Sequence, residues 1–292
     1  MTNKEFRVLV ASDGSPQAQR AIATAVRFPW PARTRVRAVV ARRTRAEYRR
    51  SILLAALDRS AEFAAGAAQR ALSERWSDAD VVVVDKTPVD GVLHEAERFG
   101  ADAIVLGWRG HGVIRRLLMG SVSRGVVRGA RCAVLVVRRR SSDLHKIVIG
   151  VDGSAHARRA VALVARLQPP PRGEVTLFRA VEQLALPAHA LSPSAIRGTV
   201  GAEVRRLNLE RITAARKELD RAAGQLTRRG WRVHVVMTTG APLRDLLDTA
   251  ATTHAHAVVV GARGAGGVRH LLLGSVAEGV LNRCGVPVLV VR

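Results

Sequence analysis

Cysteine is scarce in this sequence, and long hydrophobic runs are absent. The two cysteines among its 292 residues, Cys132 and Cys284, lie at different places in the two halves of the chain. So few cysteines exclude a disulfide framework and are typical of a reducing cytoplasm, where we expect the protein. No apolar run reaches the roughly 18 residues of a membrane-spanning helix, and the opening MTNKEFRVLV lacks the apolar segment of a signal peptide. We therefore expect no association with membranes.

Lysine and aromatic residues are also few, which bears on the large net charge of +23. That charge suggests nucleic-acid binding, yet only four of the 47 basic residues are lysine. Aromatic residues make up 3% of the chain, too few for base-stacking platforms. Residues 1–140 carry a net charge of +13 and the remainder +10, so the excess is spread evenly. We expect no specific nucleic-acid site, only non-specific attraction at low salt.

Three well-known site motifs are missing. The sequence has no GxxxxGKS/T, and GHGVIR and GAGGVR both lack the last glycine of GxGxxG. These absences exclude a P-loop hydrolase and a dinucleotide-binding Rossmann site. No HExxH occurs among the nine histidines, and His254 and His256 flank a predicted strand rather than converge. We therefore expect no metal site built from histidine.

The sequence does contain two copies of one unit. FRVLVASDGS at 6–15 returns as KIVIGVDGS at 146–154. ADAIVLGWRG at 101–110 returns as AHAVVVGARG at 255–264, and both copies end on VLVVR. The first motif repeats after 139 residues and the second after 154, so the second copy holds about fifteen extra residues. We place them in a loop, the Pro- and Ser-containing stretch LALPAHALSPSAIRG.

Within each copy, short apolar, β-branched runs alternate with longer helical patterns. In the first copy the predicted strands are RVLVA, RVRAVVA, DVVVVD, AIVLG and AVLVV. The predicted helices lie near 16–28, 46–75, 89–99 and 121–130. Strands that are apolar on both faces are typical of a parallel sheet covered by helices. The pattern predicts an α/β fold with two tandem, doubly wound, five-stranded parallel-sheet domains of Rossmann-like type, joined by the link RRRSSDLH. We expect the domains at 1–140 and 145–292.

Two glycine turns recur with equal spacing, in GWRGHGVIRRLLMGS at 107–121 and GARGAGGVRHLLLGS at 261–275. The first glycine of each ends a strand, where ligands bind in open parallel sheets. Glycine there lets backbone approach a ligand and tolerates a positive φ. The later Gly-Ser opens a helix, whose free N–H groups and dipole attract anions. Both turns face one crevice, which suits a polyphosphate.

This spacing, G-x2-G-x9-G-S after a strand ending IVLG or VVVG, is accompanied by VLVVR downstream and by D-G-S upstream. The combination resembles the ATP-binding branch of the universal stress protein family. The similarity covers nearly the whole chain twice, so the sequence resembles a tandem-domain member. The resemblance implies an adenine nucleotide alpha hydrolase-like fold and one ATP site in each copy. It leaves AMP and cyclic AMP open as ligands.

The resemblance also implies which residues bind the nucleotide. In the first copy these are Asp13, Val39, Gly107, Arg109, Gly110, Gly120 and Ser121. In the second copy they are Asp152, Ala180, Gly261, Arg263, Gly264, Gly274 and Ser275. The glycines and serines would hold the triphosphate and ribose, and the arginines would reach phosphate. The aspartates would meet the ribose or a nucleotide-bound Mg²⁺, and Val39 and Ala180 would offer backbone to adenine. The family's Gly-x-Pro survives at 240–242, whereas Lys86 and Ala133 depart from the pattern in the first copy.

Several of these residues have a structural alternative. Asp13 either forms an Asx-turn or contacts the ligand, and we favour the ligand because Ser15-Pro16 already supplies a helix cap. In SVAE, Glu278 is predicted to complete a capping box with Ser275, which leaves only the serine N–H for phosphate. Trp108 either shields the nucleotide or lies at the rim. A solvated face is favoured over a phosphate role for the basic residues between the glycine turns, which are Arg115, Arg116, Arg269 and His270.

The leading functional hypothesis is a stress-response protein that acts as a nucleotide-dependent switch, with an unknown protein partner. A slow ATPase is an alternative, although the sequence has no Walker lysine and no evident general base beyond Asp13 and Asp152. A basic nucleic-acid-associated protein is the third. VLVVR closes each copy as an apolar edge strand, and such edges seek pairing. We expect the two to pair within the chain as a pseudo-two-fold, with a homodimer left open.

Overall fold

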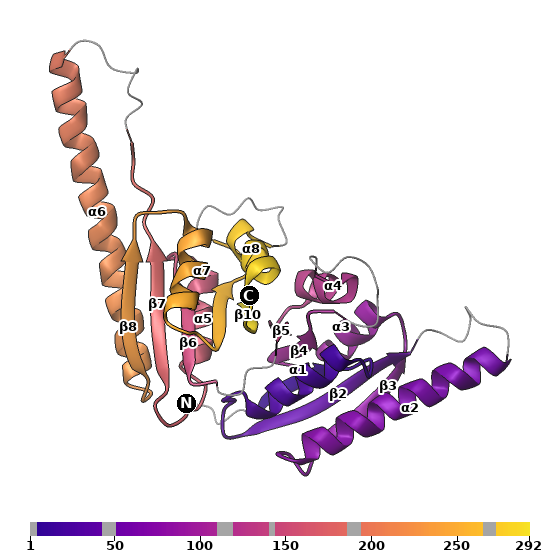
Figure 1. The fold of residues 1–292 in the computed structure, drawn as a ribbon. Helices are drawn as coiled ribbons and strands as arrows, with labels where there is room; N and C mark the ends of the chain where they lie inside the picture. The colour runs from indigo at the N-terminus through magenta and orange to yellow at the C-terminus, as the bar shows by residue number, and fades with distance from the viewer. Residues whose placement is uncertain (1–4, 43–50, 110–118, 140–143, 186–193, 265–272) are drawn as a thin grey trace.

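The computed structural model describes residues 5–42, 51–109, 119–139, 144–185, 194–264 and 273–292 (Figure 1). Strands and helices alternate in both copies, hereafter repeat one and repeat two. Repeat one contains β1 (Phe6–Ala11), α1 (Pro16–Arg27), β2 (Thr34–Arg42), α2 (Ser51–Ser73), β3 (Asp80–Asp85), α3 (Pro88–Phe99), β4 (Ala103–Gly107), α4 (Ser121–Gly129) and β5 (Ala133–Val137). Repeat two contains β6 (Lys146–Gly150), α5 (Ala155–Val164), β7 (Glu174–Ala180), α6 (Ser194–Thr227), β8 (Arg232–Thr238), α7 (Pro242–Thr252), β9 (Ala257–Gly261), α8 (Ser275–Arg283) and β10 (Val288–Val291).

The strands form one ten-stranded sheet in the order β3-β2-β1-β4-β5-β10-β9-β6-β7-β8. Within each repeat every pair of neighbouring strands is parallel. The repeats meet where β5 and β10 pair antiparallel, with Leu135 opposite Leu289. The pairing of the two VLVVR strands within one chain is therefore present, and each strand covers the apolar edge of the other.

Helices cover both faces of this sheet, as its continuously apolar strands require. Every residue of β4 and β5 is buried. On one face α1, α2, α5 and α6 contribute to a single hydrophobic core, and on the other face α3, α4, α7 and α8 contribute to a second. Both cores run across the two repeats. Among the helices whose residues the structure describes, none is long and apolar enough to cross a membrane.

The helices that follow β1 and β6 begin at equivalent caps. Ser15 Oγ accepts a hydrogen bond from Ala18 N at 3.2 Å, and Ser154 Oγ accepts one from Ala157 N at 3.0 Å. These bonds satisfy amides that the first helical turn leaves without partners. Each capping serine lies two residues after a predicted site residue, Asp13 or Asp152. The start of α1 or α5 is therefore adjacent to the predicted nucleotide site.

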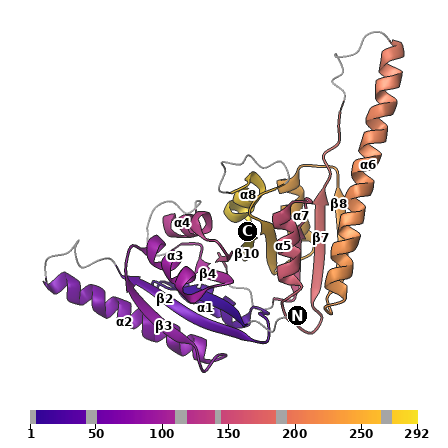
Figure 2. The same ribbon diagram turned by 180° about the vertical axis from the view of Figure 1, so that it is seen from behind.

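The extra residues of repeat two lie largely in a helix rather than in a loop. Helix α6 has 34 residues, whereas its counterpart α2 has 23. In Figures 1 and 2 the N-terminal part of α6 extends well beyond the ends of β7 and β8. The expectation of a purely loop insertion is therefore wrong, because the SAIRG end of the predicted loop is helical from Ser194.

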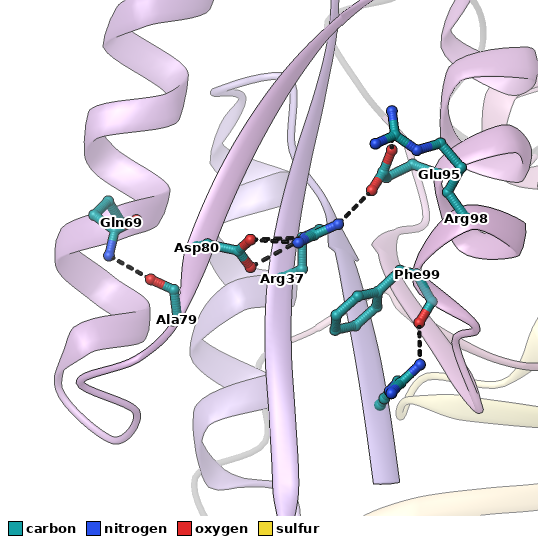
Figure 3. Close-up of polar contacts among 8 residues, drawn as sticks. Arg37, Gln69, Ala79, Asp80, Glu95, Arg98 and Phe99 are labelled. Carbon is teal, nitrogen blue, oxygen red and sulfur yellow. Dashed lines mark hydrogen bonds and ion pairs between the residues drawn. The ribbon is translucent and has the colours of Figure 1, made fainter. Parts of the chain in front are cut away.

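A partly buried ionic cluster joins β2, β3 and α3 of repeat one (Figure 3). The Arg37 guanidinium lies 2.6 Å from Asp80 and 2.8 Å from Glu95, whose side chain is 1% exposed. Hydrogen bonding to Asp80, followed by that to Glu95, raises the pKa of Arg37 despite its partial burial. The Phe99 ring stacks on the same guanidinium with a centroid distance of 4.7 Å. None of these four residues lies at the carboxyl end of a strand, where the nucleotide site is predicted.

Candidate functional site

A cavity of about 720 Å³ opens at the carboxyl ends of the repeat-two strands. It lies between β6, β7 and β9, with α6, α7 and the start of α8 as walls. This is the edge where open parallel sheets bind ligands. All seven residues predicted for the second nucleotide site line this one cavity, namely Asp152, Ala180, Gly261, Arg263, Gly264, Gly274 and Ser275.

Asp152 forms one side of the cavity through a tight turn. Its Oδ1 accepts a hydrogen bond from Ser154 N at 2.9 Å, and Gly153 between them has a φ of +82°. A Cβ on Gly264 would lie 2.7 Å from Asp152 Oδ2, so only glycine lets this loop approach the carboxylate so closely. Asp152 therefore forms an Asx-turn, and its second carboxylate oxygen faces the glycine turn. Asp13 forms the equivalent turn, with a distance of 3.0 Å from Ser15 N.

The strand-end glycines also allow close packing between strand and helix. A Cβ on Gly261 would lie 2.9 Å from Ala157 N, and one on Gly107 would lie 2.9 Å from Gln17 O. These glycines therefore let the strand end pack against the first turn of α5 or α1. Neither has a positive φ, whereas Gly14 and Gly153 have one.

The start of α8 supplies free backbone donors to the cavity. Gly274 is its N-cap, and no side chain caps the helix. Gly274 N donates to Ala262 O at 2.8 Å, which joins the second glycine turn to the first. The remaining N–H groups of the first turn and the positive end of the helix dipole thus line the cavity with Ser275, in an arrangement suited to an anion. Arg263 Nε is buried and has no hydrogen-bond partner among the described residues.

The predicted capping box is absent. Glu278 does not return to the start of α8, and its carboxylate instead lies 3.3 Å from Arg128 Nη2 on α4. With glycine as N-cap, Ser275 occupies the first helical position, where its hydroxyl is not required as a cap. Ser275 is exposed and lines the cavity, and its hydroxyl makes no capping hydrogen bond.

One wall of the cavity was not predicted. Arg179 at the end of β7 forms an ion pair with Glu218 on α6, and a Cβ on Gly153 would lie 2.7 Å from that carboxylate. Arg211, also on α6, donates to Glu182 O at 3.2 Å and lines the cavity. Charged residues on a long helix form no sequence motif. They can be recognised as part of the cavity wall only when the two repeats are aligned.

The cavity also has apolar walls. Phe178, Leu246 and Val260 line it beside Ala180, and Pro242 lines it from the start of α7. All five are buried or partly buried. A flat ring would be desolvated here while a charged tail reaches the start of α8.

In repeat one the structure describes all the predicted residues except Gly110. That glycine and the basic residues Arg115, Arg116, Arg269 and His270 lie outside the described residues. Gly120 N donates to Trp108 O at 3.0 Å and caps α4, so the second glycine turn matches that of repeat two. Ser121 is exposed at the helix start, and Arg109 is partly buried.

Val39 and Ala180 do not occupy equivalent positions. Val39 O accepts from Ser12 N at 2.9 Å, and its counterpart by register is Phe178, whose carbonyl accepts from Val151 N at 2.8 Å. The counterpart of Ala180 is Ala41, two residues beyond Val39. The predicted equivalence is wrong by two residues, a slip that keeps the side chain on the same face of the strand.

Trp108 lies neither over the nucleotide site nor at its rim. It is 4% exposed, and its Nε1 donates to Leu281 O in repeat two at 3.1 Å. The guanidinium groups of Arg109 and Arg138 lie over its ring at 4.6 and 4.3 Å from the centroid. The tryptophan in the first glycine turn of repeat one thus contacts the other repeat.

The titratable groups near the site limit its chemistry. Burial, together with the cations Arg159, Arg263 and Arg292, lowers the pKa of His156 on the first turn of α5. Away from the site, before the starts of β5 and β10, burial raises the pKa of Cys132 to about 12 and raises that of Cys284, so both thiols stay protonated at neutral pH. Across the described residues no group of three His, Cys, Asp or Glu side chains is placed to hold a metal ion.

Known proteins with similar sequences share one family name. Universal stress protein Rv2005c of Mycobacterium tuberculosis is 30% identical over 222 residues, which cover 72% of this chain and 68% of the relative. Universal stress protein Rv1996 of the same organism is 34% identical over 202 residues, 65% of this chain and 58% of the relative.

A solved structure shows the same fold over the full length. The crystal structure of a universal stress protein from Archaeoglobus fulgidus aligns with a TM-score of 0.68 at 21% identity and covers 98% of both chains. The sequence profile of the universal stress protein family matches residues 6–138 and, a second time, residues 144–292. Since these two matches span almost the whole chain, the chain belongs to the universal stress protein family and carries two of its domains in tandem.

Proposed function

We propose that this chain is a cytoplasmic stress-response protein that binds an adenine nucleotide, ATP in the first instance, in each of two domains at 1–140 and 145–292. In this proposal it acts as a nucleotide-dependent switch rather than as a fast enzyme. The observation that carries the proposal is the convergence of seven separately predicted residues on one cavity in repeat two. The family profile matches the two proposed domains separately.

The apolar and polar parts of the cavity fit the two ends of a nucleotide. The apolar wall at Phe178 and Leu246 suits adenine, and the uncapped start of α8 with Arg263 suits phosphates. Arg263 Nε has no hydrogen-bond partner in the described part of the chain, which favours an anionic ligand because a buried donor without an acceptor costs free energy. Mg²⁺ fits as an ion held mainly by the phosphates, with Asp152 as a carboxylate ligand.

A switch is favoured over an efficient ATPase by the carboxylates of the cavity. Asp152 is engaged in its own turn through Ser154 N, and Glu182 is the other carboxylate in the cavity lining. Efficient phosphoryl transfer needs a positioned nucleophile as well as charge stabilisation. Asp152 is instead placed to hold the ligand, so occupancy shifts the protein between states only through a difference in affinity.

Isothermal titration of the full chain with ATP, AMP, cyclic AMP and GTP tests the proposal. Ala214→Trp should plug the repeat-two cavity from α6, because Ala214 lines it and is exposed. The matched control Ala202→Trp lies on the same helix, is exposed and does not line the cavity. Loss of one adenine-nucleotide site in the first variant alone supports the proposal. Absence of binding by all four nucleotides, or equal binding by both variants, contradicts it.

Turnover and nucleic-acid binding separate the alternatives. ATP-to-ADP conversion above roughly 1 s⁻¹, the lower end of ordinary enzyme turnover, would assign the site to an ATPase. Nucleic-acid affinity that depends on sequence, and not only steeply on salt, would favour the third hypothesis.

A further inference from the structure

The far ends of the two phosphate-facing helices are held by the opposite repeat. At the C-terminal end of α8, Leu281 O accepts from Trp108 Nε1 at 3.1 Å and Asn282 O accepts from Arg138 Nη1 at 3.2 Å. Both donors belong to repeat one. The last carbonyls of a helix have no partners within it, so these bonds satisfy groups that the helix leaves open.

The same relationship holds in the other direction. Arg292 of repeat two donates from Nη2 to Val127 O at 2.6 Å and to Arg128 O at 2.7 Å, at the C-terminal end of α4. Arg292 and Arg138 are equivalent, since each follows the VLVV strand of its repeat. Each arginine thus reaches across the β5–β10 pairing to the helix of the other repeat. A cation at a helix C-terminus also complements the helix dipole.

These are the helices whose first turns build the proposed anion sites. Each has nine residues and is therefore about 13 Å long. A helix this short moves as one body, so its C-terminal contacts help to set where its first N–H groups point. At the other end, Gly120 N donates to Trp108 O and Gly274 N donates to Ala262 O, which fixes each helix to the first glycine turn of its own repeat.

We propose that Trp108 and Arg138 are positioning residues for the nucleotide site of repeat two, and that Arg292 is the positioning residue for that of repeat one. This rests on the proposed function, because it assumes that the starts of α4 and α8 bind the ligand. Each site is then completed by the other half of the chain, and the tandem arrangement couples the two.

The contacts that join the two repeats are not symmetric. Trp108 stands between Gly107 and Arg109 in the first glycine turn of repeat one, so one residue belongs to that turn and also holds α8. The corresponding residue of repeat two is Ala262, whose methyl group has no donor for a hydrogen bond to α4. A substitution in the repeat-one turn can therefore act on α8 through Trp108, whereas among the described residues repeat two contacts α4 through Arg292 and the exposed Glu278–Arg128 pair.

Site-resolved photolabelling of the full chain with 8-azido-ATP tests this. Labelled peptides are assigned by mass spectrometry to residues 1–140 or 145–292. Trp108→Phe should raise the concentration for half-labelling of repeat two about threefold to tenfold, the effect of one lost hydrogen bond. Arg292→Met should do the same to repeat one and leave repeat two within about twofold. Trp30→Phe is the matched control, because Trp30 is also buried and donates from Nε1, to Ala25 O at 2.9 Å, inside repeat one.

The pattern of labelling decides the outcome. Weakening of the opposite repeat by Trp108→Phe and Arg292→Met, with neither repeat weakened by Trp30→Phe, supports the positioning role. Equal effects of Trp30→Phe on repeat two, or effects of Arg292→Met confined to its own repeat, overturn it. If the unaltered chain is labelled in neither repeat, the proposed function fails. Hydrogen exchange of the α8 amides from Glu278 to Leu281 then decides alone, since Trp108→Phe should accelerate it at least threefold and unchanged exchange overturns the positioning role.

Discussion

Arg179 and Glu218 form an ion pair at the wall of the repeat-two cavity, where repeat one has Val40 and Ala64. The equivalence follows from the glycine after each strand-one aspartate. A Cβ on Gly153 would meet the Glu218 carboxylate at 2.7 Å, and one on Gly14 would meet the Ala64 methyl at 3.1 Å. The two proposed sites therefore differ in charge beside the same turn, and we expect them to differ in affinity.

Removal of the carboxylate should strengthen nucleotide binding by repeat two. Glu218→Ala copies repeat one at this position and leaves Arg179 without its partner beside an anionic ligand. We expect about a threefold to fivefold gain in ATP affinity by isothermal titration, since the pair is partly solvent-screened. Glu203→Ala is the control, because Glu203 is an exposed residue of α6 that pairs with Arg206 outside the cavity. Weaker binding by Glu218→Ala would mean that the carboxylate itself contacts the ligand.

The partly buried cluster around Arg37 should matter for stability and not for binding (Figure 3). Glu95→Ala removes a carboxylate that is 1% exposed and leaves Arg37 paired only with Asp80. We expect a loss of about 2 kcal/mol in the free energy of unfolding, measured with urea. Glu97→Ala is the matched control on the same helix, since its ion pair with Arg131 is exposed, and should change stability by less than about 0.5 kcal/mol. Similar losses in both variants would show that the cluster contributes no more to the free energy of unfolding than an exposed ion pair does.

The sequence pattern was sufficient wherever local chemistry determines structure. Apolar β-branched runs predicted the strands, such as Ala103–Gly107 and Ala133–Val137, to the residue. The glycine turn of repeat two and the family resemblance that it carries implied seven residues, and all seven line one cavity. Both signals are local, because strand burial and helix starts depend on residues close together in the chain.

The sequence-based predictions are wrong where a contact between residues distant in the sequence determines the structure. The sequence context assigns Trp108 to the site of its own repeat, but its hydrogen-bond partner Leu281 lies 173 residues away in the sequence. Val39 was placed two residues from the true counterpart of Ala180, because every second residue of a buried strand has the same pattern and only the register distinguishes them. The capping box failed for the same reason, since Glu278 is drawn to Arg128 of the other repeat.

The close approach of Gly264 to Asp152 predicts a sharp difference between two glycines. In Gly264→Ala the new Cβ would lie 2.7 Å from Asp152 Oδ2, so the carboxylate or the glycine turn must shift. We expect a loss of at least tenfold in ATP affinity in repeat two by titration. Gly285→Ala is the control, because nothing lies within 4 Å of its Cβ, and it should bind ATP as the unaltered chain does. Full affinity in Gly264→Ala would remove Asp152 from the proposed site.

His156 should make the stability of repeat two depend on pH. Burial and the neighbouring cations Arg159, Arg263 and Arg292 lower its pKa below the ordinary value of 6.5, only partly offset by Asp152. Below pH 6.5 the unfolded chain then binds more protons than the folded one, so the free energy of unfolding falls as the pH is lowered toward the depressed pKa. Above pH 6.5 both states are neutral at this residue, and its effect on stability is fully present.

The counterpart of His156 in repeat one is Gln17, which supplies the matched variant. In urea unfolding at a series of pH values, His156→Gln should flatten the fall in stability between about pH 7 and pH 5. Arg159→Gln should flatten it partly, because one of the cations that disfavour the protonated ring is removed. A slope in His156→Gln equal to that of the unaltered chain would show that other groups set the acid limit of the fold. A steeper slope would reverse the sign of the argument, since it would mean that the folded protein holds the protonated imidazole better than water does.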